Sequence, residues 1–205
     1  MADHYFTAAP ASAAEQRERI VHVGGRDVAV VTASGVFSPG HVDTGTRVLL
    51  DHVPDPSPGN FLDLGCGWGP IVLDAGLRSA AAGTDLRLWA VDVNERARGL
   101  TAANAAALGL GTVHAVEPDA VPSDVRFSTI WSNPPIRVGK SVLHDMLSTW
   151  LPRLTPGGSA YLVVAKKLGA DSLLKWLVEE GGDEFPARRV ANAKGFRVLR
   201  VDRSA

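Results

Sequence analysis

Short apolar runs alternate with stretches of helical periodicity over most of the chain. The apolar runs predict strands at 61–64, 86–91, 112–116, 127–131, 160–164 and 196–201. The intervening stretches predict helices at 70–82, 95–108, 141–154 and 170–180. Strands that alternate with helices of this length form βαβ units, with helices on both faces of a mostly parallel sheet. The pattern therefore predicts an α/β, doubly wound fold.

The first fifty residues depart from this alternation. Two β-branched runs, 19–23 and 26–32, flank Gly24-Gly25 and predict a β-hairpin. A short helix is predicted within 41–53, and the Pro/Ser/Gly-rich stretch 54–59 ends it. Residues 7–14, rich in Ala, Ser and Pro, are expected to form a poorly ordered lead-in. We expect 1–53 to pack as an extension on one compact domain formed by 54–205.

Composition narrows the class of protein. The 205 residues are 45% hydrophobic and 21% charged, as in ordinary globular domains. A single cysteine, Cys66, excludes an internal disulfide framework. No apolar run approaches the roughly 18–20 residues of a membrane helix, and no basic segment leads into an apolar one as in a signal peptide. A cytoplasmic location is the expectation.

The charge is unevenly distributed. Residues 1–136 carry 9 Lys/Arg against 15 Asp/Glu, a net of −6, whereas residues 137–205 carry 12 against 7, a net of +5. Such asymmetry can mark a phosphate-facing surface, but a solvated basic face without a partner gives the same pattern at least as often.

A glycine-rich loop follows the first strand of the alternating region and precedes a helix. In Asp63-Leu-Gly65-Cys-Gly67-Trp-Gly69-Pro70 the glycines stand at alternate positions, where the backbone can turn sharply and approach a ligand. The spacing differs from the G-x-G-x-x-G of dinucleotide-binding proteins. Asp63, two residues before the first glycine, favours a ligand that carries a cationic ammonium or sulfonium group.

Two further acids follow the next two strands. Asp92 ends the second strand, where α/β nucleotide-binding proteins place an acid against ribose hydroxyls. A helix cap is the alternative role, although Asn94 is better placed to cap the helix that begins at Glu95. Asp119 follows the third strand and could accept a hydrogen bond from an adenine amino group; Glu117 and Asp124 are nearby alternatives.

The fourth strand ends in Asn133-Pro134-Pro135-Ile136. Prolines have no N–H, and each disfavours the helical conformation in the residue before it, so this loop is stiff and offers carbonyl acceptors. The Asn133 side-chain oxygen and the Pro134 carbonyl can converge on one amino group. Holding both hydrogens of a conjugated NH₂ turns its lone pair toward an electrophile, and this positioning needs no strong base.

These loops, in this order, resemble class I S-adenosylmethionine-dependent methyltransferases that act on planar nitrogens. The upstream segment Gly35-Val-Phe-Ser-Pro-Gly-His-Val-Asp43-Thr-Gly-Thr46 is similar to the small catalytic domain of bacterial 16S ribosomal RNA guanine-N2 methyltransferases. His4-Tyr-Phe and the closing Lys194-Gly-Phe-Arg-Val-Leu199 extend the resemblance over nearly the whole chain.

The resemblance implies a seven-stranded Rossmann-like sheet, S-adenosylmethionine as cofactor, and RNA as partner. It implies that Asp63, Gly65 and Gly67 contact the methionine part of the cofactor, Asp92 the ribose and Asp119 the adenine. Asp43 and Thr46 would lie near the methionine end, and Asn133 to Ile136 would hold the target nitrogen beside the cofactor. Two departures are visible: Ile136 stands where many relatives have an aromatic residue, and longer members carry an additional N-terminal domain.

Three other functions remain as alternatives. A glutamine-amide methyltransferase acting on a translation factor also uses Asn-Pro-Pro, normally followed by Tyr, so Ile136 disfavours it. An inactive cofactor-binding module that interacts with RNA is disfavoured by the intact Asp63, Asp92 and Asn133. An NAD-dependent oxidoreductase is disfavoured by the glycine spacing.

Overall fold

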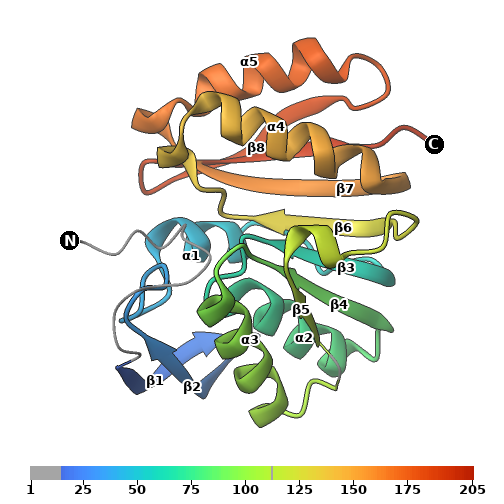
Figure 1. Ribbon diagram of the computed structural model, residues 1–205. Helices are drawn as coiled ribbons and strands as arrows, with labels where there is room; N and C mark the ends of the chain where they lie inside the picture. Colours follow the sequence, from blue (N-terminus) through green and yellow to red (C-terminus); the bar gives the residue numbers. More distant parts are fainter. Residues whose placement is uncertain (1–14, 112) are drawn as a thin grey trace.

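A seven-stranded sheet with the order β5-β4-β3-β6-β7-β9-β8 forms the centre of the molecule (Figure 1). The computed structural model describes residues 15–111 and 113–205. Strand β9 pairs antiparallel with both of its neighbours, β7 and β8. All other neighbouring strands of the sheet are parallel. The strands are β3 (Gly59–Leu64), β4 (Leu86–Val91), β5 (Val113–Val116), β6 (Phe127–Ser132), β7 (Leu154–Ala165), β8 (Ala187–Ala193) and β9 (Phe196–Asp202). The expected α/β, mostly parallel seven-stranded sheet is confirmed.

Helices cover both faces of this sheet, as the sequence predicts. The helices are α1 (Thr44–Leu50), α2 (Pro70–Ala82), α3 (Glu95–Ala107), α4 (Lys140–Trp150) and α5 (Ala170–Gly181). Four single turns of 3₁₀ helix follow strands or helices at Pro118–Ala120, Ile136–Val138, Leu151–Arg153 and Lys166–Leu168. Along β3, Phe61 packs into one core with α1, α2 and α3, while Leu62 packs into a second core with α4 and α5. Alternate residues of one strand therefore face opposite layers.

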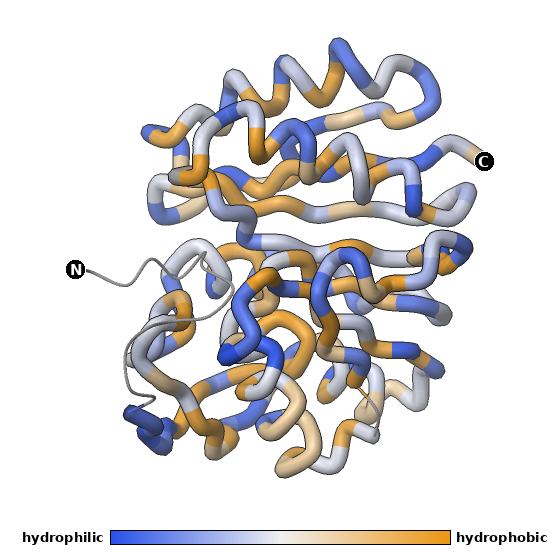
Figure 2. Tube along the Cα trace, viewed as in Figure 1, coloured by the Kyte–Doolittle hydropathy of each residue, from blue (hydrophilic) through white to orange (hydrophobic). Residues whose placement is uncertain are grey.

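Hydrophobic residues are concentrated along the strands, and the outer helices alternate between hydrophobic and hydrophilic positions (Figure 2). Trp131 of β6 is fully buried and packs edge-on against Phe61, with ring centroids 5.0 Å apart. Among the described residues, no helix is long and apolar enough to cross a membrane.

The predicted hairpin is present as β1 (Gln16–Val23) and β2 (Arg26–Ala33). It forms its own two-stranded sheet and packs against α2 and α3. Two buried side chains fasten it: Asp74 accepts from the Gly24 N–H at 2.7 Å, and Asn104 exchanges two hydrogen bonds with the backbone of Val31. His4-Tyr-Phe lies outside the described residues.

Three elements differ from the sequence-based prediction. Helix α4 ends at Trp150, because Pro152 follows and cannot continue it. Strand β7 begins at Leu154 rather than at residue 160, since its Pro/Gly-rich start pairs with the chain end through two 2.9 Å hydrogen bonds between Arg203 and Gly157-Gly158. Strand β8 was not predicted at all: it is a largely exposed edge strand without a clear apolar alternation.

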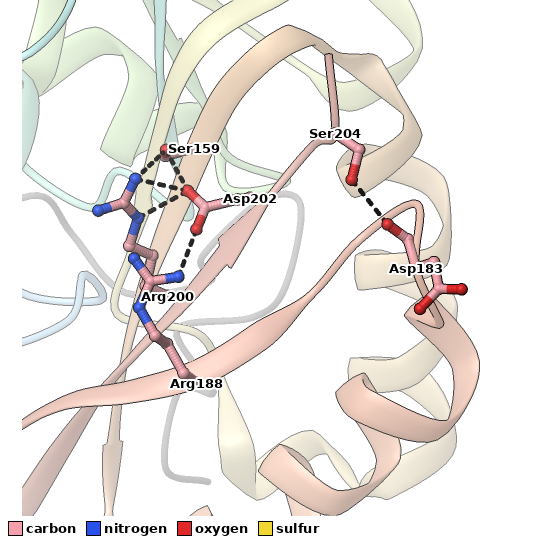
Figure 3. Close-up of polar contacts among 6 residues, drawn as sticks. All are labelled: Ser159, Asp183, Arg188, Arg200, Asp202 and Ser204. Atoms are coloured by element: carbon pink, nitrogen blue, oxygen red, sulfur yellow. Dashed lines mark hydrogen bonds and ion pairs between the residues drawn. The ribbon is translucent and has the colours of Figure 1, made fainter.

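A polar cluster ties the C-terminal strands together (Figure 3). The Asp202 carboxylate accepts hydrogen bonds from Ser159, Arg188 and Arg200, each at 2.6 Å. Burial alone would raise the pKa of Asp202, but these three hydrogen bonds outweigh it and lower that pKa below its ordinary value. Two of the basic residues in the positively charged half of the chain are therefore neutralised within the fold.

Candidate active site

A cavity of about 750 Å³ lies beyond the carboxyl ends of β3, β4, β6 and β7. Its lining is largely apolar, and its charged residues are Asp43, Asp92 and Lys167. Open α/β sheets bind ligands at this edge of the sheet. The residues that line it include Val36, Phe37, Asp43, Leu64, Gly65, Gly67, Val91, Asp92, Pro118, Asn133, Pro134, Pro135, Ile136, Trp150, Lys167 and Phe196.

The glycine loop is held against the end of β4 by its own backbone. The Gly65 and Cys66 N–H groups both donate to the Val91 carbonyl, at 2.8 and 3.1 Å. Gly65 and Gly67 have φ angles of 83° and 57°, and no atom lies within 4 Å of where a Cβ would stand on either. Left-handed backbone and open space together explain why glycine occupies both positions, with the backbone exposed to the cavity.

Asp92, which directly follows β4, joins the glycine loop to the segment that precedes α3. Its carboxylate accepts from the Gly67 N–H at 3.0 Å and from the Asn94 N–H at 2.9 Å. Burial raises the pKa of Asp92, and these backbone hydrogen bonds oppose the increase. Asn94, not Asp92, caps α3 by accepting from Ala97. The capping alternative for Asp92 is therefore excluded, and Asp92 lines the cavity.

Asp63 does not line the cavity. It is fully buried behind the glycine loop, where one carboxyl oxygen accepts from the Val72 N–H in the first turn of α2 at 3.0 Å. The other oxygen has no hydrogen-bond partner in the described part of the chain. Burial raises the pKa of Asp63 to about 8, so the group holds a proton at neutral pH.

Asp119 is exposed in the turn Pro118–Ala120, and only its neighbour Pro118 lines the cavity. Thr46 is buried in α1 and does not line the cavity either. Asp43, expected beside Thr46, does reach the cavity and caps α1 by accepting from the Gly45 N–H at 2.8 Å.

The Asn-Pro-Pro loop also lines the cavity, after β6, the strand that pairs with β3. Asn133 donates its side-chain N–H groups to Asp43 Oδ2 at 3.2 Å and to Thr46 Oγ1 at 3.0 Å. The Pro134 carbonyl accepts from the Ile136 N–H at 2.8 Å, and Pro135 has φ −75° and ψ 76°, the geometry of an inverse γ-turn. A carbonyl oxygen has two lone pairs, so Pro134 keeps one for a substrate.

The segment between β2 and α1 closes one side of the cavity. The Trp68 indole donates to the Ser38 carbonyl at 3.2 Å, and the Asn94 side chain donates to the Gly35 carbonyl at 2.8 Å. Both contacts fasten this segment to the proposed cofactor loops. It brings Val36 and Phe37 to the cavity wall, and no residue-level signal in the sequence identified either one.

Phe196, Trp150 and Lys167 also line the cavity without having been predicted as site residues. Phe196 belongs to the Lys-Gly-Phe motif, which resembles the family as a segment and does not mark Phe196 as a site residue. Trp150 and Lys167 stand at element ends that the sequence placed incorrectly or left undefined, and nothing in the local pattern marks them.

The order of the strands, the reversed β9 and a cavity walled by a glycine loop and an Asn-Pro-Pro loop together define class I S-adenosylmethionine-dependent methyltransferases. Residues 27–200 match the methyltransferase small domain family. The chain belongs to this family, which confirms the resemblance seen in the sequence.

Relatives and solved structures agree with this assignment. The chain is 35% identical to the uncharacterized protein YbxB of Bacillus subtilis, over 98% of each chain. It is 35% identical to ribosomal RNA small subunit methyltransferase C of Pseudomonas paraeruginosa, over 86% of this chain and 52% of that protein, so it spans about half the length of that relative. The fold matches the 16S rRNA N2 G1207 methyltransferase of T. thermophilus, in complex with AdoMet and guanosine, with a TM-score of 0.77 and 24% identity over 92% of this chain and 50% of that one.

Proposed function

We propose that this methyltransferase transfers the methyl group of S-adenosylmethionine to the exocyclic amine of guanine in ribosomal RNA. The observation that carries this proposal is the state of the Asn133 amide. Both of its N–H groups are engaged by Asp43 and Thr46, so its oxygen is the atom left for a ligand. Together with the remaining lone pair of the Pro134 carbonyl, the loop offers two acceptors and no donor, which suits an NH₂ group.

The cavity residues fit the cofactor. The open space beside Gly65 and Gly67 admits close approach to the loop backbone, and Asp92 offers a buried carboxyl suited to ribose hydroxyls. Pro118 lies on the cavity wall where an adenine would rest, with Asp119 beside it. We propose that Asp63 acts from behind, by holding the start of α2 under the glycine loop. When bound, S-adenosylmethionine supplies a methyl group activated by a sulfonium.

On the substrate side, the chain's residues orient rather than deprotonate. The lone pair of a guanine amine is delocalised into the ring, and two acceptors that hold both hydrogens direct it out of conjugation. The extra proton remains on nitrogen until after transfer and can then leave to water. The apolar side chains of Ile136, Phe37 and Phe196 offer contact surfaces for a planar base.

RNA as the substrate is supported by the name of the methyltransferase C relatives and by basic residues that form no ion pair within the described part of the chain. Lys166 and Lys167 follow β7 directly, Lys167 lines the cavity, and the Lys166 N–H bonds the Gly195 carbonyl beside Lys194. Other basic residues of the C-terminal half, such as Arg188, Arg200 and Arg203, are paired with acids. Lys166, Lys167 and Lys194 are therefore left for phosphates, and Lys167 lines the cavity.

Single-turnover methyl transfer from labelled cofactor tests the proposal with Asn133→Ala. Loss of an oriented polar contact made mainly in the transition state lowers the rate by about 10²–10³. Cofactor affinity, measured by calorimetry, should change little. Transfer near the wild-type rate would make the loop structural. Mass spectrometry of the methylated product, with ribosomal RNA and a glutamine-containing factor offered in parallel, decides between the RNA and protein substrates.

A further inference from the structure

The amide of Asn133 is clamped by two residues about ninety positions upstream. Its nitrogen lies 3.2 Å from Asp43 Oδ2 and 3.0 Å from Thr46 Oγ1. A primary amide nitrogen carries two hydrogens, so these two contacts use both. The clamp joins the Asn-Pro-Pro loop after β6 to the first turn of α1.

The clamp has little freedom to shift. Asp43 Oδ2 also accepts from the Gly45 N–H at 2.8 Å, which fixes the carboxylate to the start of α1. A Cβ on Gly45 would lie 3.0 Å from that oxygen and 2.9 Å from Cε1 of Phe196, so the space beside it is already filled. Thr46 is only 3% exposed. It does not line the cavity, and its hydroxyl contacts Asn133, which does.

Asp43 and Thr46 differ in which orientation of the Asn133 amide they permit. If the Asn133 side-chain amide flipped and exchanged the positions of its oxygen and nitrogen, the oxygen would face Asp43 and Thr46. A threonine hydroxyl can donate to that oxygen, but an ionised carboxylate can only accept. Asp43 therefore excludes the flipped amide, and Thr46 reinforces the orientation that remains.

We propose that Asp43 and Thr46 are positioning residues that keep the Asn133 oxygen, and never its NH₂, directed at the substrate. The inference rests on the proposed function, because it concerns how Asn133 recognises a donor amine. It makes the upstream segment a determinant of substrate chemistry: an amine is accepted, and a carbonyl at the same position is not.

The clamp requires a hydrogen-bond donor at position 133 on the side that faces Asp43. Asn133→Asp would place a second carboxylate 3.2 Å from Asp43, where two ionised carboxylates repel each other and break the contact until acid adds a shared proton. Asn133→Asp should therefore be inactive at neutral pH, although aspartate offers the same acceptor atom. The double variant Asp43→Asn with Asn133→Asp reverses donor and acceptor and restores the contact. Asparagine also caps helices well, so α1 keeps its cap.

Single-turnover methyl transfer at several pH values tests this exchange. We expect Asn133→Asp to lose about 10²-fold or more at neutral pH and to recover partly in acid, where the pair shares a proton. The double variant should recover at least ten-fold over Asn133→Asp at neutral pH. The other charged cavity residues are Asp92 and Lys167, with Asp63 behind Asp92, and these are common to all variants, so the difference between profiles reports on position 133.

A second pair of variants avoids any change of charge. Thr46→Val removes the hydroxyl and should lower the transfer rate about ten-fold, whereas Thr46→Ser keeps it and should retain the wild-type rate. In the cofactor-free protein, the side-chain N–H signals of Asn133 in ¹⁵N spectra should exchange with solvent about ten-fold faster in Thr46→Val than in Thr46→Ser. Calorimetry should give equal cofactor affinity for both.

Three outcomes would overturn the clamp: full neutral-pH activity of Asn133→Asp, no recovery in a folded double variant, or equal rates and equal exchange in the two Thr46 variants. The Asn133→Ala measurement separates this from the proposed function. If that variant is inactive while the Thr46 variants are equal, Asn133 is catalytic but not clamped. If it is active, the proposed role of the loop fails.

Discussion

Gly67 combines two constraints at the scale of a single residue. Its φ of 57° disfavours any side chain, and a Cβ would point into open space at the cavity. Gly67→Val should abolish measurable S-adenosylmethionine binding in calorimetry, because the side chain would occupy the proposed cofactor space. The matched control is Gly83→Val, which has a similar φ of 66° at the end of α2 and an equally open Cβ direction away from the cavity.

Both glycine variants should lose about 1–2 kcal/mol of stability from backbone strain. Only Gly67→Val should lose the cofactor. Equal affinities in the two variants would show that the loop does not hold the cofactor.

The buried carboxyl of Asp63 predicts a pH dependence of stability. Its pKa is raised by burial from 3.8 to about 8, so the folded state holds a proton that the unfolded state releases. The resulting stabilisation is complete below pH 3.8 and disappears as the pH rises through about 8. Over that window Asp63 should lower the free energy of unfolding by up to about 1.4 kcal/mol per pH unit.

Asp63→Asn, which cannot ionise, should remove that slope. Urea denaturation of the wild type and of Asp63→Asn between pH 5 and 9 gives the free energy of unfolding of each at every pH. The difference between the two curves of free energy against pH is the contribution of Asp63. Parallel curves would mean that Asp63 is ionised in the folded state.

Residue identity predicted part of the site. Asp92, Gly67 and Asn133 could be placed because each directly follows a buried strand, and parallel strands end at one edge of a sheet. The burial of Asp63 behind the loop and the contact of Asn133 with Asp43 could not. Both depend on hydrogen bonds between segments distant in sequence, which leave no trace in spacing or periodicity.

At the scale of elements, the contact between the hairpin and α2 leaves no room for a side chain at Gly24. A Cβ on Gly24 would stand 2.3 Å from the Cβ of Leu77, whereas one on Gly25 would meet nothing within 4 Å. Both glycines have positive φ, 58° and 75°. Gly24→Ala should therefore cost about 1–3 kcal/mol more than Gly25→Ala, because overpacking adds to equal strain.

Thermal unfolding followed by circular dichroism compares the two alanine variants. We propose that residues 1–53 and 54–205 unfold as one unit, since Asp74 and Asn104 tie the hairpin to helices of the main domain. A single lowered transition is expected for Gly24→Ala. An early transition of the hairpin alone would contradict the proposal.

The elements that sequence patterns missed share a physical cause. Hydrophobic periodicity predicts a strand only where one face of the strand is buried. The residues of β8 are mostly exposed, and the strand is ordered by its pairing with β9. The start of β7 carries Pro156 and Gly157, which signal a turn, yet it extends because Arg203 supplies hydrogen bonds from the far end of the chain. Tertiary pairing overrides local preference in both cases.

At the scale of the whole molecule, the positive half of the chain predicts how RNA binding responds to salt. Phosphate contacts release counterions, so affinity should fall steeply as salt increases. Lys167→Glu, at the cavity, should weaken RNA binding and reduce the slope of log affinity against log salt by about 0.7–0.9 or more. Its cofactor affinity should stay close to that of the wild type.

Lys175→Glu is the matched control, because Lys175 on α5 is exposed and already paired with Glu179 at 3.6 Å. Filter binding across a salt series measures both variants. If Lys167→Glu and Lys175→Glu weakened RNA binding equally, RNA would respond to the overall charge of the protein and not to a binding surface at the cavity. Charge reversal at Arg137 and at Lys140, which follow the Asn-Pro-Pro loop in sequence, repeats the measurement at two further positions.

The position of β9 has a consequence for how the protein is made. Because β9 lies between β7 and β8, an interior strand of the sheet comes later in the sequence than the edge strand β8. Translation delivers residues in order from the N-terminus, so β8 has no partner and the cavity lacks Phe196 until β9 has left the ribosome. A nascent chain that stops before β9 would hold the proposed cofactor loops but lack Phe196, so we expect methyl transfer to begin only after β9 has been made.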